Sequence, residues 1–172
     1  MALLKNTVLA QMGAVTLALA ASACGGPSID GTWHQEQGTT PLPDNICAGC
    51  DLNVKATLVA DHDAKTFTLN LDMAYTALSD TIDLKGSYEI DGDLTFTIDG
   101  FTLPDGSENT TSVAEDGSQC IVLKGFAGTQ VCFPTPQTNP FFLEGNVLTV
   151  TLDNSIGGAD VSPTKLVMTQ VE

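Results

Sequence analysis

The stretch that decides the fold is TFTLNLDM, residues 66–73. Its apolar side chains occupy every second position, at Phe67, Leu69, Leu71 and Met73, and polar side chains occupy the positions between them. Successive side chains of a β-strand point to opposite faces of the sheet. The alternation therefore predicts a strand with one buried and one solvent-exposed face.

The same period of two recurs elsewhere in the chain, in segments 82–90, 94–99, 148–152 and 165–171. Asp91-Gly92 and Gly145-Asn146 lie between such segments, and glycine accepts the positive φ that tight hairpin turns require. No segment has a clear helical period, and we expect at most one helical turn, over residues 74–81.

This pattern predicts an all-β fold, an antiparallel meander of eight to ten short strands. A small closed barrel is the favoured arrangement, and a β-sandwich is the alternative. Gly86 interrupts one alternating segment and predicts a bulge or bend there. Three prolines within residues 134–140 predict an irregular loop.

The first 23 residues have the composition of an export signal. Lys5 is the only charged residue among them, residues 7–23 are mainly apolar, and the segment ends in the small residues Ala21-Ser22-Ala23. These features predict a signal peptide over residues 1–23. We expect a tether over residues 24–30 and a single β domain over residues 31–172.

Cys24 follows those small residues directly, and the segment resembles a bacterial lipobox. The resemblance implies that Cys24 carries a lipid and holds the protein in the cell envelope, on the outer membrane facing the periplasm or the cell surface. The chain has five cysteines, and lipidation of Cys24 leaves four for two disulfides. Ordinary cleavage after Ala23 is the alternative, and it would release a secreted or periplasmic protein.

The charge of the chain excludes some partners. All 21 acidic residues lie beyond residue 23, against five lysines and no arginine. Such a surface repels phosphate, so we expect no nucleic-acid partner. It also opposes docking on anionic lipid headgroups, which leaves the lipid on Cys24 as the expected membrane contact.

Gly31-Thr32-Trp33 begins the region that follows the tether. This Gly-x-Trp, placed after a lipobox and ahead of a series of hairpins, resembles the first-strand motif of bacterial lipocalin-like lipoproteins, which belong to the calycin type of barrel. The resemblance implies a barrel in which Gly31 allows a close backbone approach and Trp33 closes one end. Such a barrel holds a small apolar ligand in its mouth or is filled by its own side chains.

The remaining four cysteines fall into two groups. Cys47 and Cys50 form a Cys-x-x-Cys motif, which can be a disulfide, a redox pair or half of a zinc site. A disulfide is favoured in an exported protein. Cys120 and Cys132 flank a segment that can form a hairpin, so we expect them to pair with each other, with pairing between the two groups as the alternative.

No catalytic pattern stands out in the sequence. The chain has two histidines, no Gly-x-Ser-x-Gly and no second Cys-x-x-Cys to complete a zinc site, so we expect no enzyme, no metal and no cofactor. The predicted function is a non-enzymatic envelope lipoprotein whose barrel holds a small apolar ligand, or none. The alternative is an interaction module that binds glycan or protein through the loops at residues 99–116 and 134–140.

Overall fold

The computed structural model describes residues 28–90, 94–103, 105–160 and 163–171. Eight of its strands close into one antiparallel barrel in the order β1-β13-β10-β9-β5-β4-β3-β2. The barrel strands are β1 (Gly31–Pro41), β2 (Asp51–Asp61), β3 (Thr66–Tyr75), β4 (Leu78–Glu89), β5 (Thr95–Thr102), β9 (Gln137–Glu144), β10 (Val147–Leu152) and β13 (Thr164–Gln170).

The order of these strands is an up-and-down meander, because each barrel strand pairs with the barrel strands before and after it along the chain. The alternating segment around Leu69 pairs with β2 through Leu58 and with β4 through Leu84, so its apolar residues all face inward. The prediction of a small closed barrel is confirmed, and the β-sandwich alternative is excluded by the closed sheet.

A second sheet of five short strands was not predicted. It has the order β12-β11-β8-β7-β6 and comes from two insertions into the meander, one between β5 and β9 and one between β10 and β13. Its elements are β6 (Thr110–Val113), β7 (Gln119–Leu123), the 3₁₀ helix η1 (Lys124–Phe126), β8 (Thr129–Phe133), β11 (Ser155–Ile156) and β12 (Ala159–Asp160).

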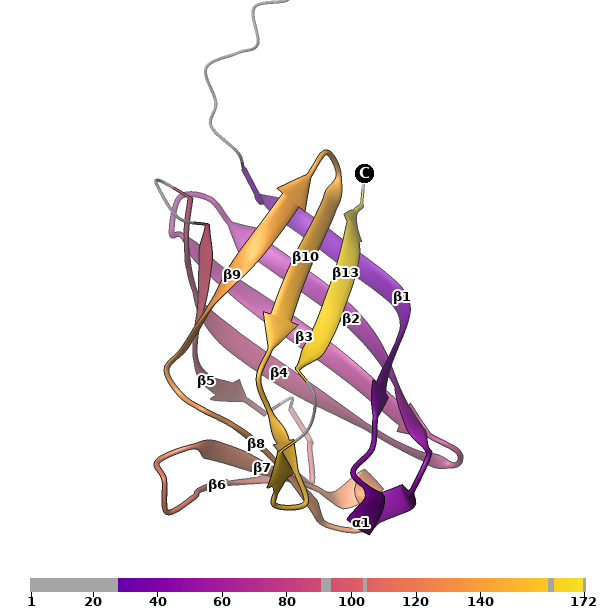
Figure 1. Cartoon of the computed structure of the whole chain (residues 1–172). Coiled ribbons are helices and arrows are strands. Elements are labelled where there is room, and N and C mark those ends of the chain that lie inside the picture. The colour runs from indigo at the N-terminus through magenta and orange to yellow at the C-terminus, as the bar shows by residue number, and fades with distance from the viewer. Residues whose placement is uncertain (1–27, 91–93, 104, 161–162, 172) are drawn as a thin grey trace, which may run out of the picture.

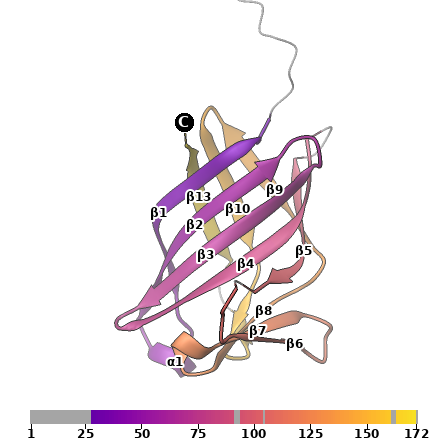
Figure 2. The same ribbon diagram turned by 180° about the vertical axis from the view of Figure 1, so that it is seen from behind.

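The second sheet lies at one end of the barrel together with the short helix α1 (Asp44–Cys47), as Figure 1 shows and Figure 2 confirms from behind. We call this end the cap end. The described chain enters β1 and leaves β13 at the opposite end, which we call the terminal end (Figure 1). None of the helices in the described ranges is long and apolar enough to cross a membrane.

The hairpin predictions have mixed outcomes. Gly145 and Asn146 form a two-residue turn between β9 and β10, and the register of β4 and β5 shifts at Gly86, as predicted. A Cβ at Gly86 would lie 1.9 Å from the Thr97 carbonyl oxygen, so the bulge requires glycine there. The predicted turn at Asp91-Gly92 falls outside the described residues.

One local prediction was wrong, and a second was wrong in part. Residues 74–81 contain a tight β-hairpin in place of a helical turn, because Thr76 takes a φ of 52° and lets Tyr75 pair with Leu78. The irregular loop predicted over residues 134–140 is confirmed for residues 134–136 and wrong for residues 137–140, which belong to strand β9. Phe141 N donates to Leu94 O on the β5 side, so the nitrogen of the preceding residue, Pro140, faces the β10 side. The pairing of β9 with β10 ends at Phe141, so no ladder hydrogen bond is needed from Pro140, and proline is tolerated there.

The barrel core differs between its two ends. Toward the terminal end it is aromatic: the Phe96 ring lies 4.7 Å from the Phe67 ring and 4.8 Å from the Phe141 ring, and Trp33 is 1% exposed. Toward the cap end the inward side chains include the smaller Leu52 and Met73 beside the single ring of Tyr75. Large rings therefore fill the terminal end, and more space remains at the cap end.

Candidate functional site

An apolar cavity of about 250 Å³ lies between the cap end of the barrel and the second sheet. Eleven of the residues that surround it have apolar or sulfur-containing side chains, and the other two, Tyr75 and Thr129, carry hydroxyl groups. The full lining is Leu42, Ile46, Cys47, Leu52, Met73, Tyr75, Leu78, Leu123, Phe126, Ala127, Thr129, Val131 and Ile156.

The barrel wall contributes its last inward-facing positions to this cavity. Leu52 is the first inward residue of β2, and Met73 and Tyr75 are the last inward residues of β3. Their placement follows from the alternation that formed the strands, because every second residue must face inward. Leu78 comes from the start of β4, across the two-residue turn from Tyr75.

The second sheet and η1 form the opposite wall. Leu123, Phe126, Val131 and Ile156 are each no more than 9% exposed and belong to the same apolar core as the barrel interior. Val131 faces Ile121 on β7 and Ile156 on β11 through regular strand pairing. The cap is therefore a rigid, hydrogen-bonded layer that continues the core across the barrel mouth.

Two apolar side chains form the exposed rim. Ile46 on α1 and Leu78 on β4 are each 39% exposed, although both also line the cavity. Ile46 packs against the β11–β12 turn, because a Cβ added to Gly157 in that turn would lie 3.0 Å from Ile46 Cδ1. The cavity therefore has an apolar opening between α1, the β3–β4 hairpin and the second sheet.

The cavity contains no charged side chain and few polar groups. The Thr129 hydroxyl donates to Phe126 O at 2.7 Å, so its proton is already used. The Tyr75 hydroxyl lies 3.1 Å from Cys47 Sγ and 3.1 Å from Cys50 Sγ. Among the described residues, the one contact between a basic side chain and a carboxylate, that of His34 with Glu36, lies elsewhere on β1.

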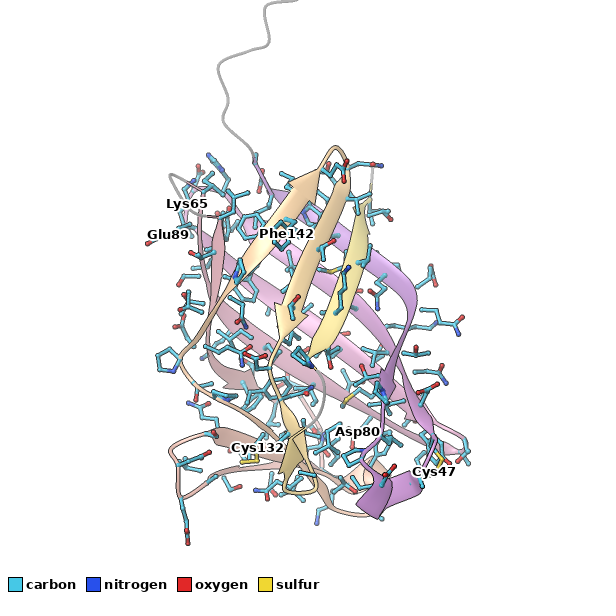
Figure 3. The ribbon with its side chains drawn as sticks, viewed as in Figure 1. Cys47, Lys65, Asp80, Glu89, Cys132 and Phe142 are labelled. Atoms are coloured by element: carbon cyan, nitrogen blue, oxygen red, sulfur yellow. A yellow bond between two sulfur atoms is a disulfide. The ribbon has the colours of Figure 1, made fainter. Side chains whose placement is uncertain are left out.

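The structure pairs the four cysteines of the described part as predicted. Cys47 is bonded to Cys50, and Cys120 is bonded to Cys132. The first disulfide closes the loop that carries α1 and touches the cavity through Cys47, while the second joins opposed residues of β7 and β8. Cys47 and Cys132 both lie at the cap end (Figure 3).

The Gly31–Trp33 motif lies at the terminal end, away from the cavity. Trp33 faces the barrel core and its Nε1 donates to Ile29 O at 2.7 Å. It pairs with Leu58 of β2 and Gln170 of β13, near the last residues of both strands. The expected role of Gly31 and Trp33 in closing this end stays a prediction. Cys24 lies outside the described residues.

A second, polar cleft of about 710 Å³ lies on the outside of the barrel. It separates the outer faces of β2, β3 and β4 from the loop at residues 105–109 and from η1. Lys55 and Lys124 both line it, together with several carboxylates. This cleft is hydrophilic and contrasts with the apolar cavity at the barrel mouth.

Asp80 fastens the cap to the barrel beside this cleft. Its Oδ1 accepts from Asn109 Nδ2 at 2.7 Å, and its Oδ2 accepts from the Gly125 amide at 2.9 Å. Asn109 is buried, and its Oδ1 accepts from the Lys124 amide. Gly125 approaches so closely that a Cβ there would lie 2.0 Å from Ser79 O. Figure 3 shows Asp80 near the cap end.

The residues that the cap contributes to the cavity were not predicted from the sequence. A signal was present, because Ile121 and Leu123 alternate, and so do Val131 and Phe133. These strands were expected only as a disulfide-linked hairpin. Nothing in their local pattern specified that the hairpin would lie across the barrel mouth.

No protein-family model matches this chain, and neither the curated proteins nor the solved structures contain a significant match. Within the described ranges, no three His, Cys, Asp or Glu side chains are grouped so that they could hold a metal ion.

Proposed function

We propose that this protein is a lipocalin-like lipoprotein of the cell envelope that binds a small apolar ligand, without catalysis, in the cavity at its cap end. The observation that carries the proposal is the apolar opening: Ile46 and Leu78 are 39% exposed at the rim of an uncharged cavity of about 250 Å³. Apolar pockets with a few polar groups are typical small-molecule sites.

The cysteine pairing supports the lipoprotein part of the proposal. The two disulfides use every cysteine except Cys24, so no partner within the chain remains for Cys24. A lipid on Cys24 removes that odd thiol. The described chain enters β1 at the terminal end, opposite the cap end that carries the cavity (Figure 1). Mass spectrometry of the mature N-terminus tests the lipidation, and an unmodified Cys24 would contradict it.

Binding is tested with a fluorescent apolar probe, N-phenyl-1-naphthylamine, and a charge placed at the rim. We expect Leu78→Glu to weaken probe binding at least about ten-fold, because a carboxylate beside an apolar ligand must lose part of its hydration. Val167→Glu is the matched control, because it adds the same charge at a residue that is 45% exposed on the outer face of β13. Equal probe affinity in both variants would contradict the proposed site.

The polar cleft supports a second candidate function, the binding of an envelope glycan. Its lining includes residues 105–109, which belong to one of the two loops expected to carry interactions. The test is calorimetric titration with soluble cell-wall oligosaccharides. Heat of binding that Lys124→Ala abolishes, with no response to the apolar probe in the unmodified protein, would favour this function over the first.

A further inference from the structure

We infer that the ligand of the cap-end cavity is an electrically neutral, mainly hydrocarbon molecule of about ten carbon atoms with one hydrogen-bond acceptor, and that the Tyr75 hydroxyl is the group that recognises the acceptor. This inference rests on the proposed function and specifies its ligand class. It follows from the charge, the polar inventory and the size of the cavity.

The charge of the lining excludes an ionised ligand group from the interior. None of the thirteen lining residues is ionisable at neutral pH. A carboxylate or ammonium placed there would lose its hydration without gaining a counter-ion, which is strongly unfavourable. The formal net charge of the protein is −15, and this negative charge makes the binding of an anionic ligand still less favourable. A fatty acid held by its carboxylate therefore does not suit the cavity.

Among the side chains that line the cavity, Tyr75 alone has a hydroxyl donor whose nearby acceptors are all weak. Its hydroxyl lies 3.1 Å from each of the two disulfide sulfurs, and sulfur is a poor hydrogen-bond acceptor. The Thr129 hydroxyl, by contrast, donates to a backbone carbonyl. A ligand carbonyl or ether oxygen would give the Tyr75 proton a better partner than sulfur does.

The size of the cavity sets the size of the ligand. A dry cavity of about 150 Å³ lined by Leu, Ile and Phe holds benzene, with six carbon atoms. The cavity here is about 250 Å³, which scales to about ten carbon atoms. A longer molecule would have to extend past Ile46 and Leu78 into solvent.

Three ligands that share one carbon skeleton test the requirement for an acceptor and the exclusion of charge separately. They are the hydrocarbon tetralin, the neutral ketone 1-tetralone and the anion tetralin-1-carboxylate. Dissociation constants come from chemical-shift titrations of the protein methyl groups at pH 7. For the unmodified protein we expect the ketone to bind about five-fold more tightly than the hydrocarbon, the worth of one net hydrogen bond. The carboxylate should bind at least about 100-fold more weakly than the ketone.

The variant Tyr75→Phe should abolish the five-fold advantage of the ketone and leave the hydrocarbon affinity unchanged. Tyr88→Phe is the matched control, because Tyr88 is the other tyrosine of the chain and donates to Asp61 O toward the terminal end. We expect it to retain the advantage.

Three results would overturn the inference while leaving apolar binding in place. They are a ketone advantage that survives Tyr75→Phe, an equal loss of hydrocarbon and ketone binding in that variant, and a carboxylate that binds as tightly as the ketone. If none of the three molecules binds the unmodified protein, the proposed apolar-ligand function itself is wrong, and the inference is overturned with it.

Discussion

At the scale of single residues, Tyr88 packs into the aromatic core of the barrel and its hydroxyl has a backbone hydrogen-bond partner. Tyr88 is 2% exposed as a residue, its ring lies 6.2 Å from the Phe96 ring, and its hydroxyl donates to Asp61 O at 3.1 Å. Lys65 Nζ lies 5.8 Å from the centre of the same ring, within the range of a cation–π contact. Tyr88 thus joins the core to the β2–β3 turn.

Burial raises the pKa of Tyr88 above its ordinary value of 10.0, and the carboxylates of Asp30, Asp61 and Asp63 raise it further. Because the folded-state pKa is the higher one, the stability linked to this group is present below pH 10 and is lost as the pH rises through the folded pKa. In a Tyr75→Phe variant Tyr88 is the only tyrosine, so we expect its absorbance titration at 295 nm to have a midpoint above 10. A midpoint below 10 would contradict the burial of this hydroxyl.

At the scale of elements, the two disulfides have different structural roles, although both lie at the cap end. Cys120–Cys132 joins strands that are already paired along their whole length, and it closes a loop of sequence separation 12. Cys47–Cys50 has a separation of only 3 and holds the loop that carries α1 against Tyr75. Its contribution is to the shape of the cavity more than to the cohesion of the sheet.

Removing each disulfide by paired alanine substitution should separate these roles. By the loop lengths, the loss of Cys120–Cys132 should cost about 3 kcal/mol of unfolding free energy and the loss of Cys47–Cys50 about 2 kcal/mol. Urea unfolding followed by circular dichroism gives both values. We expect only the Cys47→Ala, Cys50→Ala variant to weaken apolar-probe binding. A larger loss of probe binding on removing Cys120–Cys132 would contradict this assignment.

At the scale of the whole molecule, the closed barrel carries a large excess of negative charge with little internal compensation. The formal net charge is −15 with both histidines counted as neutral, and the one contact between a carboxylate and a basic side chain among the described residues joins Glu36 to His34 Nε2 at 3.3 Å. Folding gathers these carboxylates onto one compact surface. Their mutual repulsion opposes folding, and the apolar core overcomes it.

Salt should therefore stabilise this protein. Raising sodium chloride from 10 to 150 mM shortens the screening length from about 30 Å to about 8 Å, which weakens repulsion between carboxylates. We expect the urea midpoint of unfolding to rise over this range. Urea is the suitable denaturant because it is uncharged and adds no screening of its own. A midpoint that falls with salt would mean that attractive ion pairs dominate the surface.

Many strands and turns of the barrel could be predicted from the sequence, because each is specified by residues close together in the chain. The period of two around Leu69 and the turn at Gly145-Asn146 each predict a strand or a hairpin within a few residues. A meander needs mainly such neighbouring pairs. Its closure into a barrel needs in addition the distant pairing of β1 with β13, which brings Trp33 opposite Gln170 and which no local pattern predicts. The disulfide partners were predictable for the same reason, since each pair is close in sequence.

The candidate site depends on contacts that no local pattern contains. The carboxylate of Asp80 binds the Gly125 amide across 45 residues, and Ile46 rests on the β11–β12 turn at Gly157. These contacts hold each of the two insertions over the barrel mouth, and the pairing of β8 with β11 joins the insertions to each other. The sequence by itself determined an all-β meander with paired cysteines, because alternation and turns act between near neighbours. Only the tertiary structure decided that a second sheet covers one end and leaves an apolar cavity beneath it, because packing there joins side chains far apart in the chain.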